Sequence, residues 1–401
     1  MFSLAVLPFS MKKTAFFIHC TIFWTVGDIL PKCFSPLFAY QSDMINPLTG
    51  NKFPPTFLHD LSDQDKLDIL SGRVDNFNGN RLLVLPCQRC LACRLNRTST
   101  WALRCACELP YHEHSYALTL TYDDDHLPMT YLNADVSDRI NPVTGEVIGD
   151  LQMVPTLHIK DVQDFFKRLL QYEKRELNVI GIRRFYCGEY GDLRKRPHYH
   201  ALVFGLEIPD LVKTTEKSSN GFPLYSSKII SKLWQYGLVR IQPGTIQTAR
   251  YIAGYIYKKQ VGLNSSVYSD IGISAPFVHM SNDPGIGYRW LVDHPHIYDY
   301  DEIHIRNNGV MVSTQPPKYY DHIFERLSSD LSICDDLPDE TFEYLSDPNF
   351  DIQAIRDKRR AEAEERSRQE FSTVKDLSAY FETKRLNLYA KNRQKLHRNI
   401  D

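Results

Sequence analysis

The stretch "IRRFYCGEYGDLRKRPHYHALVFG", residues 182–205, constrains the fold more than any other part of the chain. Two runs rich in aromatic and branched residues flank a polar loop that contains glycine and proline. This pattern is typical of two antiparallel strands joined by a loop. Because alternate residues of a strand point to the same face, His198 and His200 should project together while Tyr199 faces the other side.

The segments around this hairpin alternate between strand and helix patterns. They predict a helix at 90–109, a strand at 116–122 and an amphipathic helix at 158–177. A short helix followed by a strand is expected at 228–242, and another helix at 245–260. This order favours an α+β fold with a central antiparallel sheet flanked by helices, and with helical additions at both ends of the chain.

The charges of the chain are unevenly distributed. The formal net charge is −2 over 401 residues, of which 43% are hydrophobic and 12% aromatic, as in a folded globular protein. Residues 330–351 are acidic and contain no basic residue, whereas residues 183–259 contain "RR", "RKR" and "YKK". Apart from the acidic segment, the chain is therefore basic enough to bind a polyanion.

The N-terminal segment could be mistaken for a targeting signal. "MKKTAFFIHCTIFWTV", which begins at Met11, resembles a secretory signal, but His19 and Cys20 interrupt its apolar run and no clear small-residue cleavage site follows. We expect residues 1–32 to be an upstream extension or a packed helix. The run is too short to predict a membrane span.

The chain contains nine cysteines, three of them in "CQRCLAC". An odd, clustered set is not a disulfide framework, so a reducing compartment is expected. Cys87, Cys90 and Cys93 would supply three of the four ligands of a structural zinc ion. Candidates for the fourth ligand are Cys105, Cys107 and Cys187. The alternative is that the thiols are reduced, partly buried and metal-free.

The histidine pair is a candidate metal site with a candidate third ligand. If the loop begins near Tyr190 and ends near Pro197, Glu189 lies opposite His198 on the partner strand, and opposed residues share a face. Two imidazoles and one carboxylate would leave coordination positions open for a substrate, as in catalytic metal sites. A slip of one residue would turn Glu189 away.

The segment "RYIAGYIYKK" is a candidate source of nucleophiles. On a helix, Tyr251, Tyr255 and Lys258 fall at i, i+4 and i+7 on one stripe, with the two phenols about 5–6 Å apart. The alternative is that both rings only pack on the sheet. A phenol has a pKa near 10, so it needs a nearby cation or a metal-polarised target. Paired phenols beside a metal suggest phosphoryl transfer through a covalent phosphotyrosine.

These motifs, taken in order, resemble a known family. "TLTY" with "DDDHLP", then "GEYG…RPHYHALVFG", then "YIAGYIYKK", are similar to the HUH endonucleases of rolling-circle replication. "PCQRCLACR…WALR" upstream and "MSNDPGIGYRW" downstream resemble the replication initiators of gokushovirus-type microviruses, which are single-stranded DNA phages. The resemblance covers about residues 33–320.

The resemblance implies a site and a reaction. Glu189, His198 and His200 would hold Mg²⁺ or Mn²⁺; because imidazole ligands suit Mn²⁺, we expect it to work at least as well in vitro. Tyr251 and Tyr255 would be the nucleophiles. The protein would nick one strand at the replication origin, keep the 5′ phosphate on a tyrosine and later rejoin the displaced strand. The residues expected to support the reaction or contact DNA are Lys258 at the phenols and Arg94, Arg97, Arg194, Lys195, Arg196 and Lys259 on DNA.

The same resemblance implies partners, a location and a division of the chain. The partners would be single-stranded origin DNA, the double-stranded replicative form and the host replication machinery, in the host cytoplasm and away from membranes. We divide the chain into an N-terminal extension, a Pro-rich loop with a Cys/Arg helix, an HUH-type catalytic domain, an irregular accessory segment, and an acidic segment with a charged helical tail. These parts cover residues 1–32, 33–110, 111–262, 263–320 and 321–401.

Two other functions remain open on the sequence. The protein could bind nucleic acid without cleaving it, with structural histidines, or it could be an HUH relaxase or transposase with a similar site. The charged tail is expected to be a solvated helix, although it could also grip DNA or a partner.

Overall fold

The computed structural model describes most of the chain from Cys33 onward. The described residues are 33–48, 50, 52–132, 143–144, 152–191, 195–218, 221–258, 268–269, 271–300, 303–307, 310–331 and 337–397. The predicted N-terminal extension (1–32) lies outside them.

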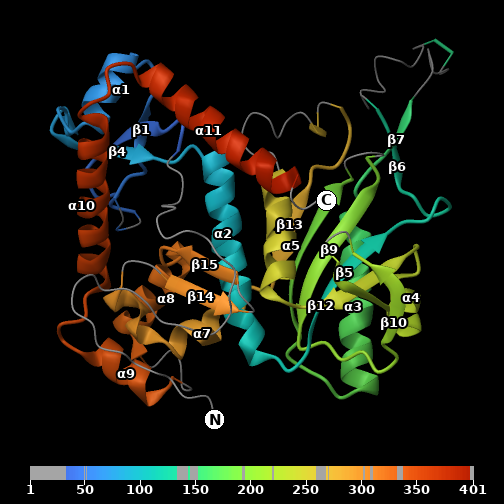
Figure 1. The fold of residues 1–401 in the computed structure, drawn as a ribbon. Coiled ribbons are helices and arrows are strands. Elements are labelled where there is room, and N and C mark those ends of the chain that lie inside the picture. The colour runs from blue at the N-terminus through green and yellow to red at the C-terminus, as the bar shows by residue number, and fades with distance from the viewer. Residues whose placement is uncertain are drawn as a thin grey trace.

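A seven-stranded antiparallel sheet forms the centre of the molecule, in the order β10-β11-β12-β5-β9-β8-β13 (Figure 1). Its strands are β5 (Ser115–Thr121), β8 (Arg183–Tyr190), β9 (Pro197–Phe204), β10 (Val212–Lys217), β11 (Pro223–Ser226), β12 (Val239–Pro243) and β13 (Phe277–Met280). Helices flank this sheet, so the predicted α+β fold is confirmed.

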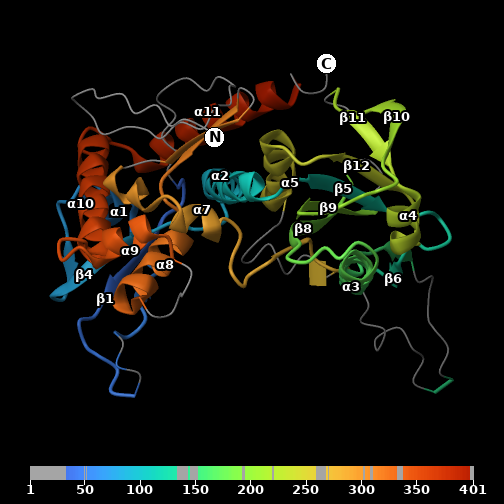
Figure 2. The same ribbon diagram turned by 90° about the horizontal axis from the view of Figure 1, so that it is seen from below.

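Helices cover both faces of the sheet (Figure 2). One face carries α2 (Leu91–Glu108) and α5 (Ile246–Lys258), and the other carries α3 (Ile159–Glu176) and α4 (Lys228–Trp234). The alternation along β9 explains this double burial, because Leu202 and Phe204 enter the core under α2 and α5 while the intervening residues enter the other core. A strand that is apolar on both faces needs cover on both.

The helices form where the sequence predicts them. In α3, Val162, Phe165, Phe166 and Leu169 are buried in one stripe, as expected for an amphipathic helix against a sheet. In α2, Cys90 is the N-cap, and the helix runs without a Pro or Gly to its end. Its second half is almost entirely buried, since it lies between α5 and the C-terminal helices.

The segment predicted to be irregular, 263–320, contains regular elements. β13 forms the edge of the central sheet, with Phe277 opposite Gly188 and Met280 opposite Phe185. A Cβ on Gly188 would lie 2.6 Å from the Phe277 ring, so the glycine admits this close approach. The segment also contributes the elements α7 (Tyr288–Val292), η4 (Pro295–Asp299), β14 (Ile303–Asn307) and β15 (Val310–Thr314), and the beginning of α8 (Lys318–Ser329).

The segment after Cys33, expected to be loop-like, contributes to a second sheet of order β2-β1-β4-β3. Its elements, with the helix between them, are β1 (Leu37–Gln41), β2 (Thr56–Leu58), α1 (Asp63–Leu70), β3 (Asn76–Phe77) and β4 (Asn80–Leu85). The strand pairing was missed because β1 is short and its partner β4 begins about 40 residues later in the chain.

The charged tail is helical but is not a free solvated helix. After α9 (Asp339–Ser346) come α10 (Ile352–Phe371) and α11 (Leu377–His397). Phe371 and Leu377, at the junction of the last two helices, are buried against Phe38, Leu67 and Leu70 of the second sheet and α1. The two ends of the described chain therefore share a small core, and Figure 1 shows α10 and α11 beside α1.

The remaining elements are short. β6 (Met129–Tyr131) and β7 (Met153–Pro155) form a separate two-stranded sheet, and η1 (Leu109–Tyr111) follows α2. Among the described residues, no helix is both long enough and apolar enough to cross a membrane.

Candidate active site

The β8–β9 hairpin places the predicted metal ligands on one face of the sheet. Glu189 is the direct partner of His198, so the predicted register is confirmed, and Cys187 is the partner of His200. Gly191 lies just after β8, where a Cβ would lie 3.1 Å from the Cε1 atom of His198. The small residue therefore allows the turn to pass close to the imidazole.

Each histidine has a hydrogen-bond partner at Nδ1. Nδ1 of His198 lies 2.7 Å from the carbonyl oxygen of Arg196, which can only accept, so this nitrogen carries the proton and donates. Nδ1 of His200 lies 3.2 Å from Oγ1 of Thr119, its partner on β5. Metal-bound histidines are usually held in this way through the nitrogen that does not bind the ion. The chemistry of these donors therefore suits a divalent ion bound through Nε2.

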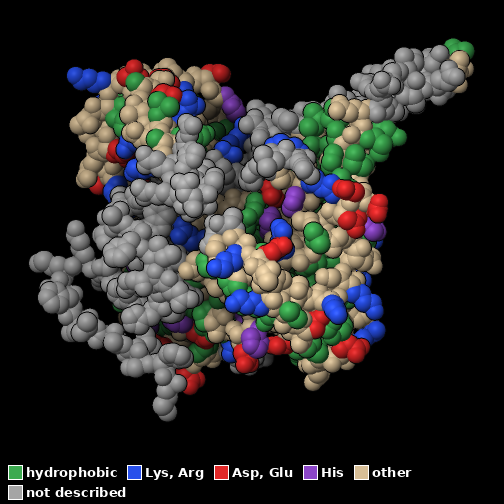
Figure 3. Space-filling model, turned by 45° about the vertical axis from the view of Figure 1, so that its right-hand side comes forward, with side chains coloured by type: hydrophobic (Ala, Val, Ile, Leu, Met, Phe, Trp, Pro, Cys, Tyr) green, Lys and Arg blue, Asp and Glu red, His purple; other side chains and the backbone are tan. Residues whose placement is uncertain are grey.

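Glu189 and His200 are buried near one another. Both are about 5% exposed, and Nε2 of His200 lies 3.5 Å from Oε1 of Glu189. The rings of His198 and His200 are nearly parallel, with centroids 6.5 Å apart. Figure 3 shows histidine side chains in a hollow of this face of the molecule, with Lys and Arg side chains near its edge.

Helix α5 brings the two predicted nucleophiles to this group. The Tyr255 ring stacks on His200 with centroids 4.0 Å apart, and the Tyr251 ring lies 5.1 Å from that of Tyr255. The Tyr255 hydroxyl donates a hydrogen bond to the Tyr251 hydroxyl. Tyr251 is 49% exposed, so a phenol at the site reaches the surface.

The environment of Tyr255 keeps its hydroxyl protonated in the absence of an ion. Burial raises its pKa well above the usual value, and the neighbouring Tyr251 hydroxyl and Glu189 carboxylate raise it further. Positive charge at the site would oppose all three effects. Lys258, the predicted supporting cation, ends α5, and its side chain lies outside the described residues.

The predicted DNA-contacting residues are placed in different settings. Arg196 forms an ion pair of 2.6 Å with Asp124 and donates to the backbone carbonyls of Tyr122 and Asp123, so it fastens the hairpin loop to the end of β5. Arg97 donates to Gln88. The other predicted residues are Arg94, half-buried on α2, Lys195, at the hairpin turn, and Arg194 and Lys259, outside the described residues.

Arg104 is not a surface residue, although the sequence suggested that it decorates α2. It is 8% exposed, its guanidinium lies 4.0 Å from the Tyr319 ring centroid, and Nε donates to the carbonyl of Ile286. Its role is to join α2 to the C-terminal helices. The partners come from more than 180 residues away, so no local pattern could reveal this burial.

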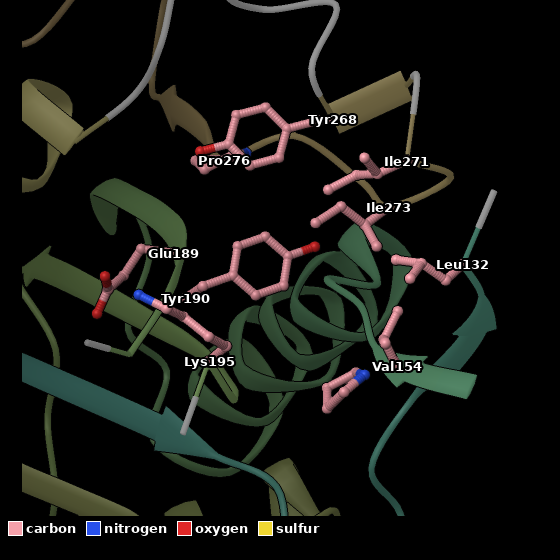
Figure 4. A pocket seen from close by; sticks show the side chains of 10 residues that line it. Leu132, Val154, Glu189, Tyr190, Lys195, Tyr268, Ile271, Ile273 and Pro276 are labelled. Carbon is pink, nitrogen blue, oxygen red and sulfur yellow. The ribbon is translucent and has the colours of Figure 1, made fainter. Parts of the chain in front are cut away.

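A cavity of about 550 Å³ opens beside Glu189. Figure 4 shows Tyr190 and Tyr268 side by side in its wall, with Leu132 and Ile273 nearby. Lys195 supplies a cation at the same cavity. Aromatic and aliphatic walls next to a cation are suited to an unpaired nucleotide, whose base stacks and whose phosphate is negative.

Comparison with known proteins identifies the family. Residues 115–260 match the family described as Replication-associated protein ORF2. Replication-associated protein ORF2 of Spiroplasma virus 4 is 30% identical over 281 residues, which are 68% of this chain and 79% of that protein. The chain belongs to the phage replication-associated proteins.

Two other family members show similar identity over shorter spans. Replication-associated protein VP4 of Bdellovibrio phage phiMH2K is 31% identical over 206 residues, 51% of this chain and 57% of its own. Replication-associated protein ORF4 of Chlamydia phage 1 is 29% identical over 182 residues, 44% of this chain and 39% of its own. No solved structure matches the chain. These relatives support a replication initiator of the gokushovirus type.

The family match has clear boundaries on the fold. It begins at the first residue of β5 and ends just after α5, so it contains the hairpin and both tyrosines. The cysteine cluster, α2 and the C-terminal helices lie outside it. Sequence reasoning missed Thr119, the partner of His200, although its position in the "TLTY" strand could have indicated it.

Proposed function

We propose that this replication initiator is a metal-dependent endonuclease that nicks one strand of phage DNA at the replication origin through a 5′-phosphotyrosine. The observation that carries the proposal is the stack of Tyr255 on His200, which brings two phenols to the face that holds Glu189 and His198. The nick would start rolling-circle replication. Single-stranded origin DNA and the double-stranded replicative form would be the substrates.

The ligands have a simple division of work. Glu189, His198 and His200 would hold one Mg²⁺ or Mn²⁺ ion. A bound ion would polarise the scissile phosphate and stabilise the charge that develops on it. Thr119 and the Arg196 carbonyl orient the two imidazoles, so the donors are arranged before an ion arrives.

The tyrosines carry the covalent step. A phenol oxygen attacks phosphorus, the O–P bond to tyrosine forms and the P–O3′ bond breaks. The tyrosine proton leaves, and the departing 3′ oxygen gains one to become a hydroxyl that can prime synthesis. Because the phosphotyrosine keeps the energy of the broken bond, a later 3′ hydroxyl can displace the tyrosine without a nucleotide cofactor.

The pairing of the phenols suits two successive transfers. Tyr251 and Tyr255 share a hydrogen bond, so either hydroxyl can occupy the place next to the metal ligands after a small movement of the other. One tyrosine would hold the first 5′ end while the second cuts the regenerated origin. Joining the released 3′ hydroxyl to the first end would then close the displaced circle.

Adduct formation tests the proposal. Purified protein is incubated with single-stranded origin DNA, labelled on the 3′ side of the nick, and either Mn²⁺, Mg²⁺ or EDTA. Denaturing gels should show a protein–DNA adduct with either metal and none with EDTA. The double variant Tyr251→Phe/Tyr255→Phe should bind the DNA and form no adduct. Tyr389→Phe, on α11 and 46% exposed, is a matched control that should form adducts normally.

Two results would reject the nicking mechanism. Adducts formed in EDTA by metal-stripped protein would exclude a metal-dependent step. Wild-type protein that binds origin DNA but forms no adduct with either metal would indicate a binding protein that does not cleave.

A further inference from the structure

Four cysteine thiols meet where the second sheet joins α2. Cys33, Cys87, Cys90 and Cys93 have sulfur atoms all within 4.8 Å of one another. In the part of the chain that the structure describes, this is the only group of three or more His, Cys, Asp or Glu donors so closely gathered. It lies outside the family match and has no place in the nicking reaction.

The sulfur spacing matches a tetrahedral metal site. Sγ of Cys33 lies 3.8 Å from Sγ of Cys90, and Sγ of Cys87 lies 4.0 Å from Sγ of Cys93. Zinc binds thiolates at about 2.3 Å, so two sulfurs of a regular tetrahedron lie about 3.8 Å apart. A disulfide would require about 2.05 Å. The four residues are free cysteines arranged around a common centre.

Backbone amides point at these sulfurs, as they do when the sulfurs are thiolates. The amide of Cys87 donates to Sγ of Cys33, and the amide of Cys90 donates to Sγ of Cys87, both at 3.3 Å. The amide of Ser35 also donates to Cys33, at 3.4 Å. Gln88 has a left-handed backbone, with φ of 63°, which folds the chain back toward the first sulfur. Hydrogen bonds to an ionised acceptor are stronger than those to a neutral one.

We propose that Cys33, Cys87, Cys90 and Cys93 bind one structural Zn²⁺ ion through four thiolates. The sequence suggested three of these ligands, but its candidates for the fourth were wrong. Those candidates, Cys105, Cys107 and Cys187, are buried in the main core instead. Cys33 supplies the fourth sulfur from 54 residues before Cys87, and a closed set of four thiolates is typical of a structural site.

The ion would fasten the second sheet to the helices of the active site. Cys33 precedes β1 and Cys87 follows β4, and the pairing of Leu37 with Leu85 puts these residues at the same end of the strand pair. Cys90 and Cys93 begin α2, which packs along α5, the helix of the two tyrosines. Figure 1 shows β4 leading into the start of α2. Zinc binding would therefore stabilise the placement of α2 under α5.

Metal analysis of the full chain tests the site. Protein prepared without chelators should contain one zinc ion per chain that survives dialysis. The double variant His198→Ala/His200→Ala should retain it, which excludes zinc held at the proposed active site. Cys33→Ser should lose it and should melt at a lower temperature. Cys107→Ala, a buried cysteine outside the cluster, is the matched control and should keep the ion.

A second measurement covers the case in which Cys33→Ser does not fold. In wild-type protein, a mercurial reagent should release the zinc as it titrates four thiols, and cobalt in place of zinc should give the absorption of a tetrahedral thiolate complex. A zinc-free wild type, or a Cys33→Ser variant that keeps its zinc, would overturn the proposal. Neither outcome depends on DNA, so this test and the adduct test can fail separately.

Discussion

The two faces of the central sheet place the same kinds of side chain in opposite situations. On the face under α3 and α4, the Tyr199 hydroxyl is enclosed: it donates to the carbonyl of His158, lies 2.9 Å from the Tyr122 hydroxyl and accepts from the His158 amide. On the face under α5, His198 and His200 are each oriented at Nδ1, and the phenols beside them reach the surface. Adjacent residues of β9 therefore differ completely in setting.

This difference indicates what each face contributes. Hydrogen bonds within a closed network stabilise the fold, because a buried polar group left without a partner costs free energy. Groups that are oriented but face an opening can bind an ion and a substrate. We therefore expect substitutions under α5 to change the reaction more than stability, and substitutions under α3 and α4 to do the reverse.

The largest expected effect is that of His200→Ala. Loss of one imidazole ligand should lower the nicking rate by at least about 10³-fold, since a bound ion contributes several kcal/mol to the transition state. Binding to single-stranded DNA should change less than about threefold, because phosphate contacts dominate it. Adduct formation measured in a single turnover, together with fluorescence anisotropy, checks both.

The control for this substitution is His114→Ala. His114 is exposed and pairs with Glu207 at 2.7 Å, at the opposite end of β5 from the site. It should nick at the wild-type rate. A His200→Ala protein that melts normally and nicks within tenfold of wild type would remove the metal role from this face.

The catalytic face was more predictable from sequence than its surroundings because its geometry is local. One hairpin fixes the opposition of Glu189 and His198, and one helical repeat fixes the spacing of Tyr251 and Tyr255. Strand alternation and helix periodicity encode such relations over a few residues. The meeting of α5 with β9 was an expectation based on family resemblance, and local patterns do not encode it.

The features that were missed all depend on contacts between distant parts of the chain. Cys33 meets Cys90 across 57 residues. The tail packs through Phe371 onto Phe38, about 330 positions earlier. β13 is only four residues long and pairs with β8 across a long connection. Local propensity says nothing about such pairings, because tertiary contacts create them.

A smaller effect, on stability alone, is expected for Tyr199→Phe. The ring is fully buried, and removal of its hydroxyl leaves the amide and carbonyl of His158 without their partner. The free energy of unfolding should fall by about 1–3 kcal/mol. Denaturant unfolding measures this loss, and single-turnover nicking should stay within about twofold of wild type. A tenfold loss of nicking with unchanged stability would show that the two faces are not separate in their roles.

The smallest expected effect is a change in pH dependence at Glu173, on α3. Its carboxyl group is fully buried and accepts a hydrogen bond from the Glu207 amide. Burial raises its pKa to about 7, against about 4.3 in the unfolded chain. The folded state therefore holds a proton that the unfolded state releases, so the stability of the wild type should decline as pH rises from about 4.3 to about 7.

Glu173→Gln should remove that decline, because its amide does not ionise. Relative to wild type, the variant should gain about 1–2 kcal/mol in unfolding free energy between pH 5 and pH 8. Glu176→Gln, on the exposed side of the same helix, is the matched control and should follow the wild-type curve. Unfolding curves for all three proteins at several pH values provide the comparison. Parallel curves for wild type and Glu173→Gln would mean that Glu173 titrates at the same pH in both states, and that burial under α3 imposes no cost on its charge.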